Sequence, residues 1–343
     1  DAIHTETLVN TEWLQKLSLK APTTVDELYN VLVAFRDQDP NGNGKKDEVP
    51  LMGLTHTNGR GVDGYIFNAF IPYAASRYAN IDDNGKAYSP WITDEYRQAL
   101  IFTNKLVKER LLRATTFVGT ENDLKRMLNP VGDDPYTVGV VCAWITGDFQ
   151  AESNSIHVYE AIPALSDATG KGGYSLFDSG VFMNRFCITQ WCENPRLAWR
   201  FMDYMCSDEA FMRQRWGKEG VDWDWIENTE FKDQAKGSGI YGGDADWVLY
   251  QVRRPNCNWG TPMGIYTELS PEQFYDASST EFSNVYYKKS ADNVRMQQAI
   301  GEPVNQLLVF TRTPEEDEIF ETYNADVNSY YRTMRDEFCM GYK

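Results

Sequence analysis

DPNGNGKKDEVP, residues 39–50, is the stretch of sequence around which the rest of the chain is organised. Oxygen-bearing side chains recur through it at nearly alternate positions: Asp39, Asn41, Asn43, Asp47 and Glu48. Two glycines stand among them, and a glycine permits the positive φ angle that a tight loop requires. This alternation directs successive carboxylate and amide oxygens into the loop, where they can surround a hard cation with about six to eight ligands.

The first half of this stretch matches the loop of an EF-hand, whereas the second half departs from it. Pro50 stands at the twelfth position, where an EF-hand has a bidentate Glu, so Asp47 and Glu48 would have to supply the last ligands. Lys45, at the seventh position, would contribute its backbone carbonyl. We expect a structural calcium site here. The alternative is an ordinary Gly/Asn turn that follows a helix.

The composition limits the classes of function. The 343 residues suggest about two domains, and 33 Lys and Arg against 50 Asp and Glu give a net charge of −17. An acidic surface repels phosphate backbones, which argues against nucleic acid as a partner. The 10 Trp, 20 Tyr and 17 Phe suit flat apolar ligands that carry hydroxyl groups, such as sugars. The six cysteines form no C-x-x-C pair and the three histidines are far apart, so zinc is not indicated.

Short apolar runs alternate with segments of 3.6-residue periodicity, which predicts a mixed α/β fold. We expect helices over three ranges: 24–36, 93–112 and 195–213. We expect strands over four ranges: 5–10, 138–143, 158–162 and 181–188. Thr24 is the expected N-cap of the first of these helices, with Glu27 at the capping-box position. Because that helix ends at residues 39–50, it can fix the geometry of the proposed calcium loop.

Two aromatic residues are candidates for contact with a ligand. Trp144 ends the apolar run 138–144, and open α/β sheets bind ligands beyond the carboxyl ends of their strands. Tyr65 follows a Gly-rich segment and belongs to a series of aromatic residues spaced by two and three positions. Each has an ordinary alternative: Trp144 as a core tryptophan, and Tyr65 as part of an aromatic stripe in the core.

An aromatic and acidic stretch, WGKEGVDWDW at 216–225, offers an enzymatic alternative. Asp222 and Asp224 could form the carboxylate pair of a glycosidase, whose members flank the scissile bond. They are, however, close neighbours beside a turn, and the chain has no GxSxG motif, P-loop or GxGxxG after a strand. We therefore expect binding without catalysis.

The segment WLQKLSLKAPTTVDELYNVLVAFRDQDPNGNGKKDEVPL, residues 13–51, resembles extracellular solute-binding proteins of family 1. These are the calcium-bearing lipoproteins that deliver substrates to ABC importers. Four later segments are similar to the same family: YRQALIFTNKLVKERLL at 96–112, TVGVVCAW at 137–144, residues 186–225, and residues 311–343. The resemblance covers nearly the whole chain, and the DPNGNGKKDE loop is its most specific part.

The resemblance implies a set of calcium ligands: Asp39, Asn41, Asn43, the carbonyl of Lys45, Asp47 and Glu48. The implied fold is a periplasmic-binding-protein-like α/β fold of two lobes, with a hinge and with the ligand in the cleft between the lobes. Trp144 and Tyr65 resemble aromatic positions that stack on sugars in maltodextrin-binding relatives, and Trp259 resembles a third.

The same resemblance divides the chain. Residues 1–10 correspond to a hinge-strand region, 11–178 to lobe 2 with the calcium loop 39–50, 179–228 to a returning portion of lobe 1, and 229–343 to a return to lobe 2 and C-terminal helices. We expect the first lobe to be incomplete here, and the signal peptide and lipid-attachment cysteine to be absent from this chain. Such a chain would expose sheet edges and apolar faces, so we expect weak ligand binding or association with itself or a complementary fragment.

The implied function is the substrate-binding component of an ABC importer that binds a carbohydrate, and most readily an oligosaccharide, without catalysis. Its expected partners are the permease subunits, and its expected location is extracytoplasmic, at the cell surface or in the periplasm, through a lipid anchor on the full-length protein. Two alternatives stay open. One is a carbohydrate-active enzyme that uses Asp222 and Asp224, and the other is a surface lipoprotein with no role in transport.

Overall fold

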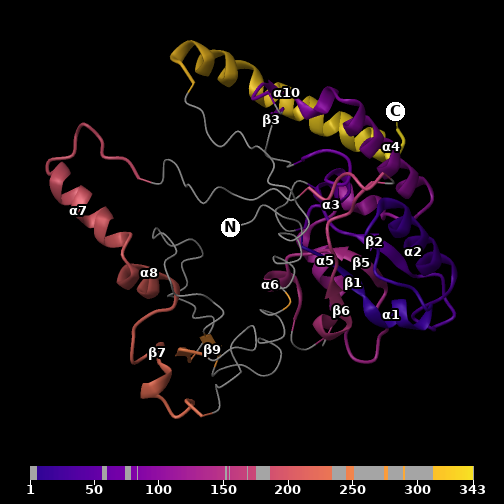
Figure 1. Ribbon diagram of the computed structural model, residues 1–343, viewed down its shortest axis with the longest axis horizontal. Coiled ribbons are helices and arrows are strands. Elements are labelled where there is room, and N and C mark those ends of the chain that lie inside the picture. Colours follow the sequence, from indigo (N-terminus) through magenta and orange to yellow (C-terminus); the bar gives the residue numbers. More distant parts are fainter. Residues whose placement is uncertain are drawn as a thin grey trace. The chain divides into compact units, whose positions relative to one another are not determined.

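The computed structural model describes residues 6–55, 60–73, 79–82, 84–150, 153, 155–167, 169–174, 186–233, 245–250, 274–276, 289 and 312–342. The chain divides into two compact units (Figure 1). The first unit comprises Asp1–Ser179 and Lys289–Lys343, and the second comprises Gly180–Lys288. The assignment of these segments to lobes stays a prediction.

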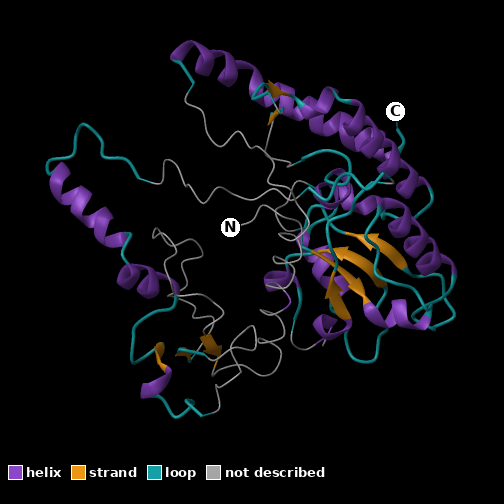
Figure 2. Ribbon diagram, viewed as in Figure 1, coloured by secondary structure: helices purple, strands orange, loops and turns teal. Residues whose placement is uncertain are grey.

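A four-stranded sheet forms the centre of the first unit, in the order β2-β5-β1-β6 (Figure 2). Its strands are β1 (Thr7–Asn10), β2 (Val49–Met52), β5 (Val138–Cys142) and β6 (Tyr159–Ala161). β1 is antiparallel to β5 and β6, with Leu8 opposite Val141, whereas β2 runs parallel to β5. Every residue of β1, β2 and β5 is buried, which explains the continuous apolar runs of β2 and β5.

Two helices from the N-terminal part of the chain contribute to this core. α1 (Thr11–Lys16) is capped by the side chain of Asn10, and α2 (Val25–Asp37) is capped by Thr24, whose hydroxyl accepts from the amide of Glu27. The predicted helix 24–36 and its N-cap are confirmed. Phe35 of α2 is fully buried and lies against Gly139 of β5, where any Cβ would overlap the ring. α2 can therefore approach β5 this closely because residue 139 is a glycine, which has no side chain.

The other elements of the first unit connect and cover this core. The helices are α3 (Val62–Phe67), α4 (Asp94–Lys108), α5 (Glu121–Leu128), α6 (Ile145–Asp148) and α10 (Pro314–Met340). The short 3-10 turns are η1 (Pro90–Ile92), η2 (Ala114–Phe117) and η4 (Ser155–Val158), and β3 (Asn80–Ile81) pairs with β4 (Ala87–Tyr88). α10 lies alongside α4 (Figure 1), and Asn104 of α4 donates to the carbonyl of Phe338 at 2.8 Å.

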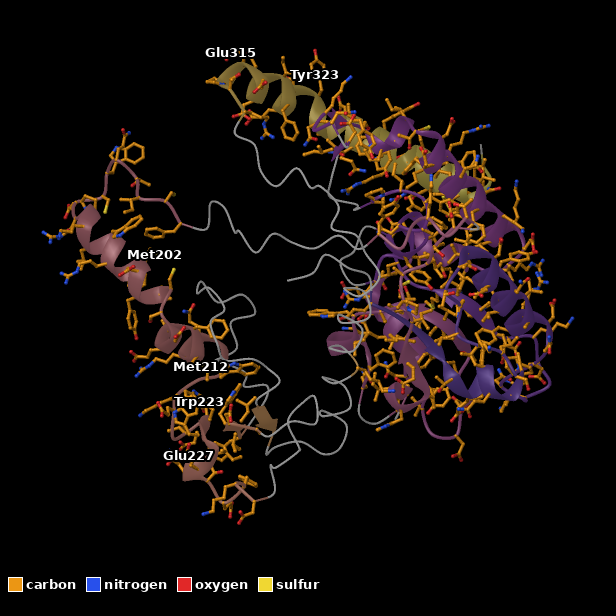
Figure 3. The ribbon with its side chains drawn as sticks, viewed as in Figure 1. Met202, Met212, Trp223, Glu227, Glu315 and Tyr323 are labelled. Atoms are coloured by element: carbon orange, nitrogen blue, oxygen red, sulfur yellow. The ribbon has the colours of Figure 1, made fainter. Side chains whose placement is uncertain are left out.

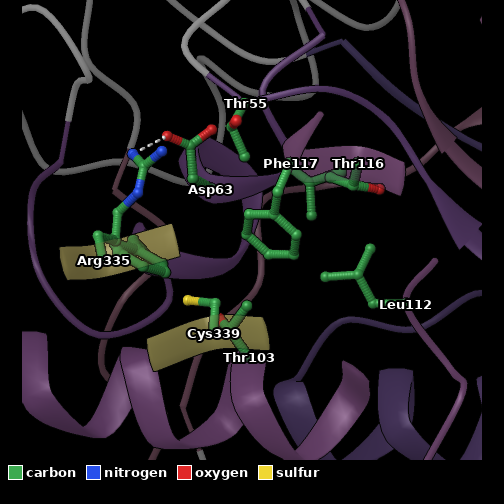
Figure 4. A pocket seen from close by; sticks show the side chains of 10 residues that line it. Thr55, Asp63, Thr103, Leu112, Thr116, Phe117, Arg335 and Cys339 are labelled. Atoms are coloured by element: carbon green, nitrogen blue, oxygen red, sulfur yellow. Dashed lines mark hydrogen bonds and ion pairs between the residues drawn. The ribbon is translucent and has the colours of Figure 1, made fainter. Parts of the chain in front are cut away.

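A buried polar network fastens the C-terminal half of α10 to the core. Arg335 donates to Asp63 of α3 at 2.8 Å and to the hydroxyl of Tyr73 at 2.8 Å. Tyr331 stacks on Trp91, with ring centroids 3.8 Å apart. Figure 4 shows Arg335 and Asp63 facing each other beside a small pocket. The N-terminal half of the same helix is exposed, as at Tyr323 (Figure 3), so only one half of α10 contributes to the core.

Within its described residues, the second unit contains two helices and a small sheet. The helices are α7 (Pro195–Met205) and α8 (Asp208–Arg215), and a short 3-10 turn, η5 (Ile226–Asn228), follows the first strand. The strands are β7 (Trp223–Trp225), β8 (Trp247–Leu249) and β9 (Phe274–Asp276), in the order β7-β8-β9. Trp247 is 1% exposed and lies between Trp216 and Trp223, which makes an aromatic centre for this unit. No residue of α7 is buried.

Three sequence predictions are corrected in detail. The single helix expected at 195–213 is two helices, because Ser207 interrupts it and caps α8 through the amide of Ala210. The helix expected at 93–112 ends at Lys108, and Leu112 forms a bridge with Leu51. For the strand expected at 181–188, residues 181–185 lie outside the described residues, and 186–188 are not in a strand.

Candidate functional site

The loop after α2 folds back on itself through the side chains that the sequence singled out. The two carboxylate oxygens of Asp39 accept from the amides of Gly42 and Gly44, each at 3.0 Å. Asn41 accepts from the amide of Asn43 at 3.0 Å, and Asn43 accepts from the amide of Lys45 at 2.7 Å. Gly42 and Gly44 have φ angles of 74° and 72°, which other residues rarely adopt. The glycines therefore allow the loop to wrap around its own oxygens.

The acidic end of this loop closes toward its beginning. Asp47 accepts from the side-chain amides of Asn41 at 2.9 Å and Asn43 at 3.0 Å. Burial raises the pKa of Glu48, and the nearby charges of Asp39 and Asp47 raise it further. Three carboxylates are thus held close enough to repel one another.

Glu48 has an unusual position for a carboxylate. Its Oε1 oxygen is buried and has no hydrogen-bond partner. A buried oxygen without a donor is costly, and a bound cation is one of the groups that can satisfy it. An all-oxygen donor set of carboxylates and amides is also the chemistry that calcium prefers. The residues of the loop therefore fit the ion on donor type and on this orphaned oxygen.

The loop does not form a finished cage of acidic ligands. Within the described part of the chain, no three His, Cys, Asp or Glu side chains are grouped so that they could hold a metal ion. Both oxygens of the Asp39 carboxylate face backbone amides instead, and Lys16 donates to the carbonyl of Pro40 at 2.8 Å where the loop leaves the helix. The predicted ligands therefore lie in one loop, but their oxygens do not all face a common position for a metal ion.

Trp144 lies where the sequence predicts it, just beyond the carboxyl end of β5, as the N-cap residue of α6. Its side chain is 49% exposed, which is unusual for so large an apolar group at the end of a buried strand. Trp144 is therefore not a buried core tryptophan, which was the alternative considered from the sequence. Its backbone amide donates to Asp148 at 2.8 Å, which fixes the turn that presents the side chain.

An arginine supports this tryptophan. The guanidinium carbon of Arg60 is 5.3 Å from the centre of the Trp144 ring, within the range of a cation–π contact. Arg60 is almost completely buried and binds Asp148 through two hydrogen bonds, at 2.7 and 2.9 Å. It also donates to Glu121 of α5 at 2.9 Å. Burial alone would lower the pKa of Arg60, but the hydrogen bonds and charge of Asp148 outweigh it and raise that pKa.

The sequence analysis missed both Arg60 and Asp148. Arg60 stands in the same Gly-rich segment that precedes Tyr65, and Asp148 follows Trp144 by four residues. The available sequence signal for Arg60 was a charged residue within a Gly-rich segment. This signal was insufficient, because the hydrogen bonds between Arg60 and Asp148 join residues 88 positions apart in the chain.

The remaining predicted residues are placed differently from Trp144. Tyr65 of α3 is 4% exposed, so its ring is part of the core, which is the alternative that the sequence left open. Its hydroxyl has no hydrogen-bond partner, and burial raises its pKa well above the ordinary value. Trp259 lies outside the described residues. Among the described helices, none is both long enough and apolar enough to cross a lipid bilayer.

Asp222 and Asp224 make local contacts in the second unit. Asp222 is 5% exposed and accepts from the amide of Lys218 at 2.7 Å. Asp224 accepts from the amide of Trp225 at 2.8 Å and from the side-chain amide of Asn228 at 3.1 Å. Each of these carboxylates stabilises a turn beside β7, which is a structural use for both.

No family model matches the chain. Three curated proteins are similar to parts of it. FusA, a fructooligosaccharide ABC transporter substrate-binding protein of Streptococcus pneumoniae serotype 4, is 27% identical over 215 residues, 62% of this chain and 38% of FusA. YtcQ, a polygalacturonan/rhamnogalacturonan-binding protein of Bacillus subtilis strain 168, is 32% identical over 65% of this chain and 44% of YtcQ. The lipoprotein LipO of the same strain is 36% identical over 33% of this chain and 22% of LipO. The aligned parts of the sequence thus span less than half the length of each of these relatives.

Solved structures match over nearly the whole chain. FusA of S. pneumoniae in complex with kestose superimposes with a TM-score of 0.72 and 18% identity, covering 99% of this chain and 66% of FusA. An EF-hand mutant of FusA in complex with fructo-nystose gives a TM-score of 0.70 at 19% identity, over 99% of this chain and 66% of that chain. The chain has the fold of the ABC-transporter solute-binding proteins. The α/β class predicted from the periodicity is confirmed, as is the resemblance to solute-binding proteins, and FusA and YtcQ are binding proteins by name.

Proposed function

We propose that this chain is the substrate-binding component of an ABC importer and that it binds an oligosaccharide without catalysis. The ligand would lie between two lobes, as the periplasmic-binding-protein fold implies. Partners would be the permease subunits of the importer. The protein would act outside the cytoplasm, at the cell surface or in the periplasm, and a lipid anchor on the full-length protein would hold it at the membrane.

The observation that supports this proposal is the half-exposed Trp144 at the carboxyl end of β5. Burial of an indole face against the C–H face of a sugar ring is a strong apolar contact, and a large exposed ring beyond a sheet edge suits that role. Trp259 would be a second ring in contact with the sugar. Tyr65 has its ring in the core, so any part it plays in the site would be structural.

The relatives favour a carbohydrate over other solutes. FusA is a fructooligosaccharide-binding protein, and YtcQ is a polygalacturonan/rhamnogalacturonan-binding protein. The enzymatic alternative would need Asp222 and Asp224 to act on a glycosidic bond, and both carboxylates are engaged in local hydrogen bonds. A lipoprotein with no role in transport is the second alternative, since binding alone does not require an importer.

Calorimetric titration with kestose and with oligogalacturonides tests the proposal, combined with chromatography of the sugar after incubation. We expect stoichiometric binding of one of these sugars and no released product. Trp144→Ala should weaken binding by roughly tenfold or more while the melting temperature stays nearly unchanged, because the removed ring is half exposed.

Trp191→Ala is the matched control, since Trp191 is also an exposed tryptophan, at 79%, but lies in a turn after residues 186–190, which form no strand. It should leave affinity unchanged. Release of product that is lost in Asp222→Asn would establish the enzymatic alternative instead. A large loss of stability in Trp144→Ala with affinity intact would show that Trp144 serves packing only.

We also propose that residues 39–48 bind a structural calcium ion. Its ligands would be these: Asp39, Asn41, Asn43, the carbonyl of Lys45, Asp47 and Glu48. The orphaned Oε1 of Glu48 and the mutual repulsion of the carboxylates are the features that support an ion here. The similar FusA structure with fructo-nystose is that of an EF-hand mutant, so a loop of this type belongs to that relative. When bound, the ion would supply positive charge and hold the end of α2 in place, while the loop's own glycines let its oxygens turn inward.

A further inference from the structure

Two groups contact the indole of Trp144, one on α6 and one from a distant segment of the chain. Gly147 lies one helical turn along α6, and a Cβ added to it would stand 2.8 Å from Cε3 of the indole and 3.2 Å from Cδ2. The six-membered ring of Trp144 therefore rests directly on the backbone of Gly147. Any side chain at this position would push the indole away.

Arg60 holds the same ring from another element. Its guanidinium carbon is 5.3 Å from the ring centre, and its own position is fixed by three hydrogen bonds. Two of these go to Asp148, which is fully buried and also accepts from the amide of Trp144. A planar guanidinium bound at three of its nitrogens to two carboxylates has little freedom to turn.

The cluster contains charged groups of both signs. Arg60 faces Asp148 and Glu121, and Lys125 of α5 lies 3.9 Å from Asp148. With the buried Glu6, whose charge also acts on Arg60, the cluster has two cations and three anions, so it has no excess positive charge to attract an anionic ligand. The charged groups of this cluster bind one another, and Arg60 and Asp148 also contact Trp144, so the cluster is suited to orient the Trp144 ring.

We propose that Gly147 and the Arg60–Asp148 pair are positioning residues that hold the indole of Trp144 in one orientation, so that its exposed part is ready for a sugar ring. This inference rests on the proposed function of Trp144 in carbohydrate binding. A side chain held in its binding orientation loses little conformational entropy when the ligand arrives, which increases affinity. Substitution of a positioning residue should weaken binding although the sugar never touches it.

Gly147→Ala is the sharpest variant. Alanine is a better helix former than glycine and Gly147 has no positive φ angle, so α6 itself should not suffer. The added methyl group must displace the indole from the backbone on which it rests. Arg60→Lys is the second variant, because a lysine cannot reproduce the two-pronged contact with Asp148. Arg126→Lys, at an exposed arginine of α5 that pairs with Asp123, is its control.

Fluorine NMR of protein labelled with 5-fluorotryptophan reports the ring directly. The protein has 10 tryptophans, and the signal that is lost in Trp144→Phe identifies Trp144. We expect Gly147→Ala and Arg60→Lys to shift or broaden this signal while the signal of Trp247, identified by Trp247→Phe, stays in place. Arg126→Lys should leave both signals unchanged.

Titrations with kestose and with trigalacturonate provide the second measurement. For the sugar that the unsubstituted protein binds, we expect roughly tenfold weaker binding in Gly147→Ala, the order expected when an aromatic contact is disturbed. An unchanged Trp144 signal in both variants would overturn the proposal. So would a shifted signal with unchanged affinity. If neither sugar binds the unsubstituted protein, the proposed function fails for these sugars, whereas the fluorine signals alone still decide whether the ring is positioned.

Discussion

Arg335 donates a hydrogen bond to Asp63, 272 residues earlier in the chain, at 2.8 Å, and the two side chains are only 1% and 5% exposed. The pair joins α10 to α3 and so attaches the C-terminal helix to a segment near the start of the first unit. Burial would lower the pKa of Arg335, but the charge of Asp63 raises it well above its ordinary value. The guanidinium of Arg335 therefore stays charged in the core, and the carboxylate of Asp63 compensates that buried charge.

The first prediction concerns the loss of this arginine. Arg335→Met leaves Asp63 buried and, among the described residues, with the hydroxyl of Tyr73 as its remaining side-chain donor, at 3.0 Å. Removal of one partner of a buried pair typically costs about 3–5 kcal/mol, so we expect a loss of that order in the free energy of unfolding. Urea denaturation followed by circular dichroism measures it.

Two further variants show whether the ion pair is the cause. Arg332→Met changes an exposed arginine of the same helix and should alter stability by less than about 0.5 kcal/mol. Asp63→Leu combined with Arg335→Met removes both charges and should recover much of the loss, because an apolar pair can replace a buried ion pair. Equal losses in Arg335→Met and Arg332→Met would contradict this account of how α10 is fastened.

The second prediction concerns the contact of α2 with the sheet. In Gly139→Ala the new Cβ would overlap the Phe35 ring and approach the carbonyl of Pro50 to 3.0 Å. Overpacking of this kind costs about 1–3 kcal/mol. Phe35→Leu makes room for the methyl group, so the double variant should be less destabilised than the sum of the two single variants. Thermal denaturation of all three variants measures this coupling, and strict additivity would show that Phe35 and Gly139 do not press on each other.

The sequence predicted best those elements whose ends are determined locally. α2 begins one residue after Thr24, as expected, because the Thr24 hydroxyl and Glu27 lie within one turn of each other. The strand before Trp144 was found for the same reason, since its five residues form one continuous apolar run. Ser207 shows the limit of periodicity, because an apolar face continues across it while its side chain starts a new helix.

The candidate site was predicted only in part, for a physical reason. Trp144 and the loop 39–50 are visible in short windows of sequence. Arg60 and Asp148 are not, because the hydrogen bonds that give them meaning form only when segments 88 residues apart meet in the fold. The burial of Tyr65 is likewise a property of the packed core and not of its neighbours in sequence.

The third prediction concerns the cysteines. Burial raises the pKa of Cys142 to about 12 and that of Cys339 to about 12, so at pH 8 only about one thiol in ten thousand is ionised at each. Cys187 and Cys206 are exposed. We expect iodoacetamide at pH 8 to modify Cys187 and Cys206 in the native protein and to leave Cys142 and Cys339 unmodified. Peptide mass spectrometry measures the modification of each cysteine. All four should react in urea, and rapid labelling of Cys142 without denaturant would contradict the packing of β5.

The fourth prediction concerns the ion proposed for the loop after α2. Without a cation, the carboxylates of Asp39, Asp47 and Glu48 repel one another, and Oε1 of Glu48 is buried without a donor. Calcium would reverse the sign of these interactions. Calcium at about 100 times its dissociation constant should add about 2.7 kcal/mol to the free energy of unfolding, and a chelator should remove that increment. Differential scanning calorimetry with calcium, with chelator, and with magnesium measures the effect.

Asp39→Ala should abolish this response to calcium, because both oxygens of Asp39 organise the beginning of the loop. Asp82→Ala is the matched control. Asp82 also accepts from two backbone amides of a Gly-containing turn, those of Asn84 and Lys86, but that turn has no second oxygen-rich half. It should weaken its own turn and leave the calcium response intact. A calcium response that survives in Asp39→Ala would move the ion elsewhere, and no response in the unsubstituted protein at millimolar calcium would end the proposal of an ion in this loop.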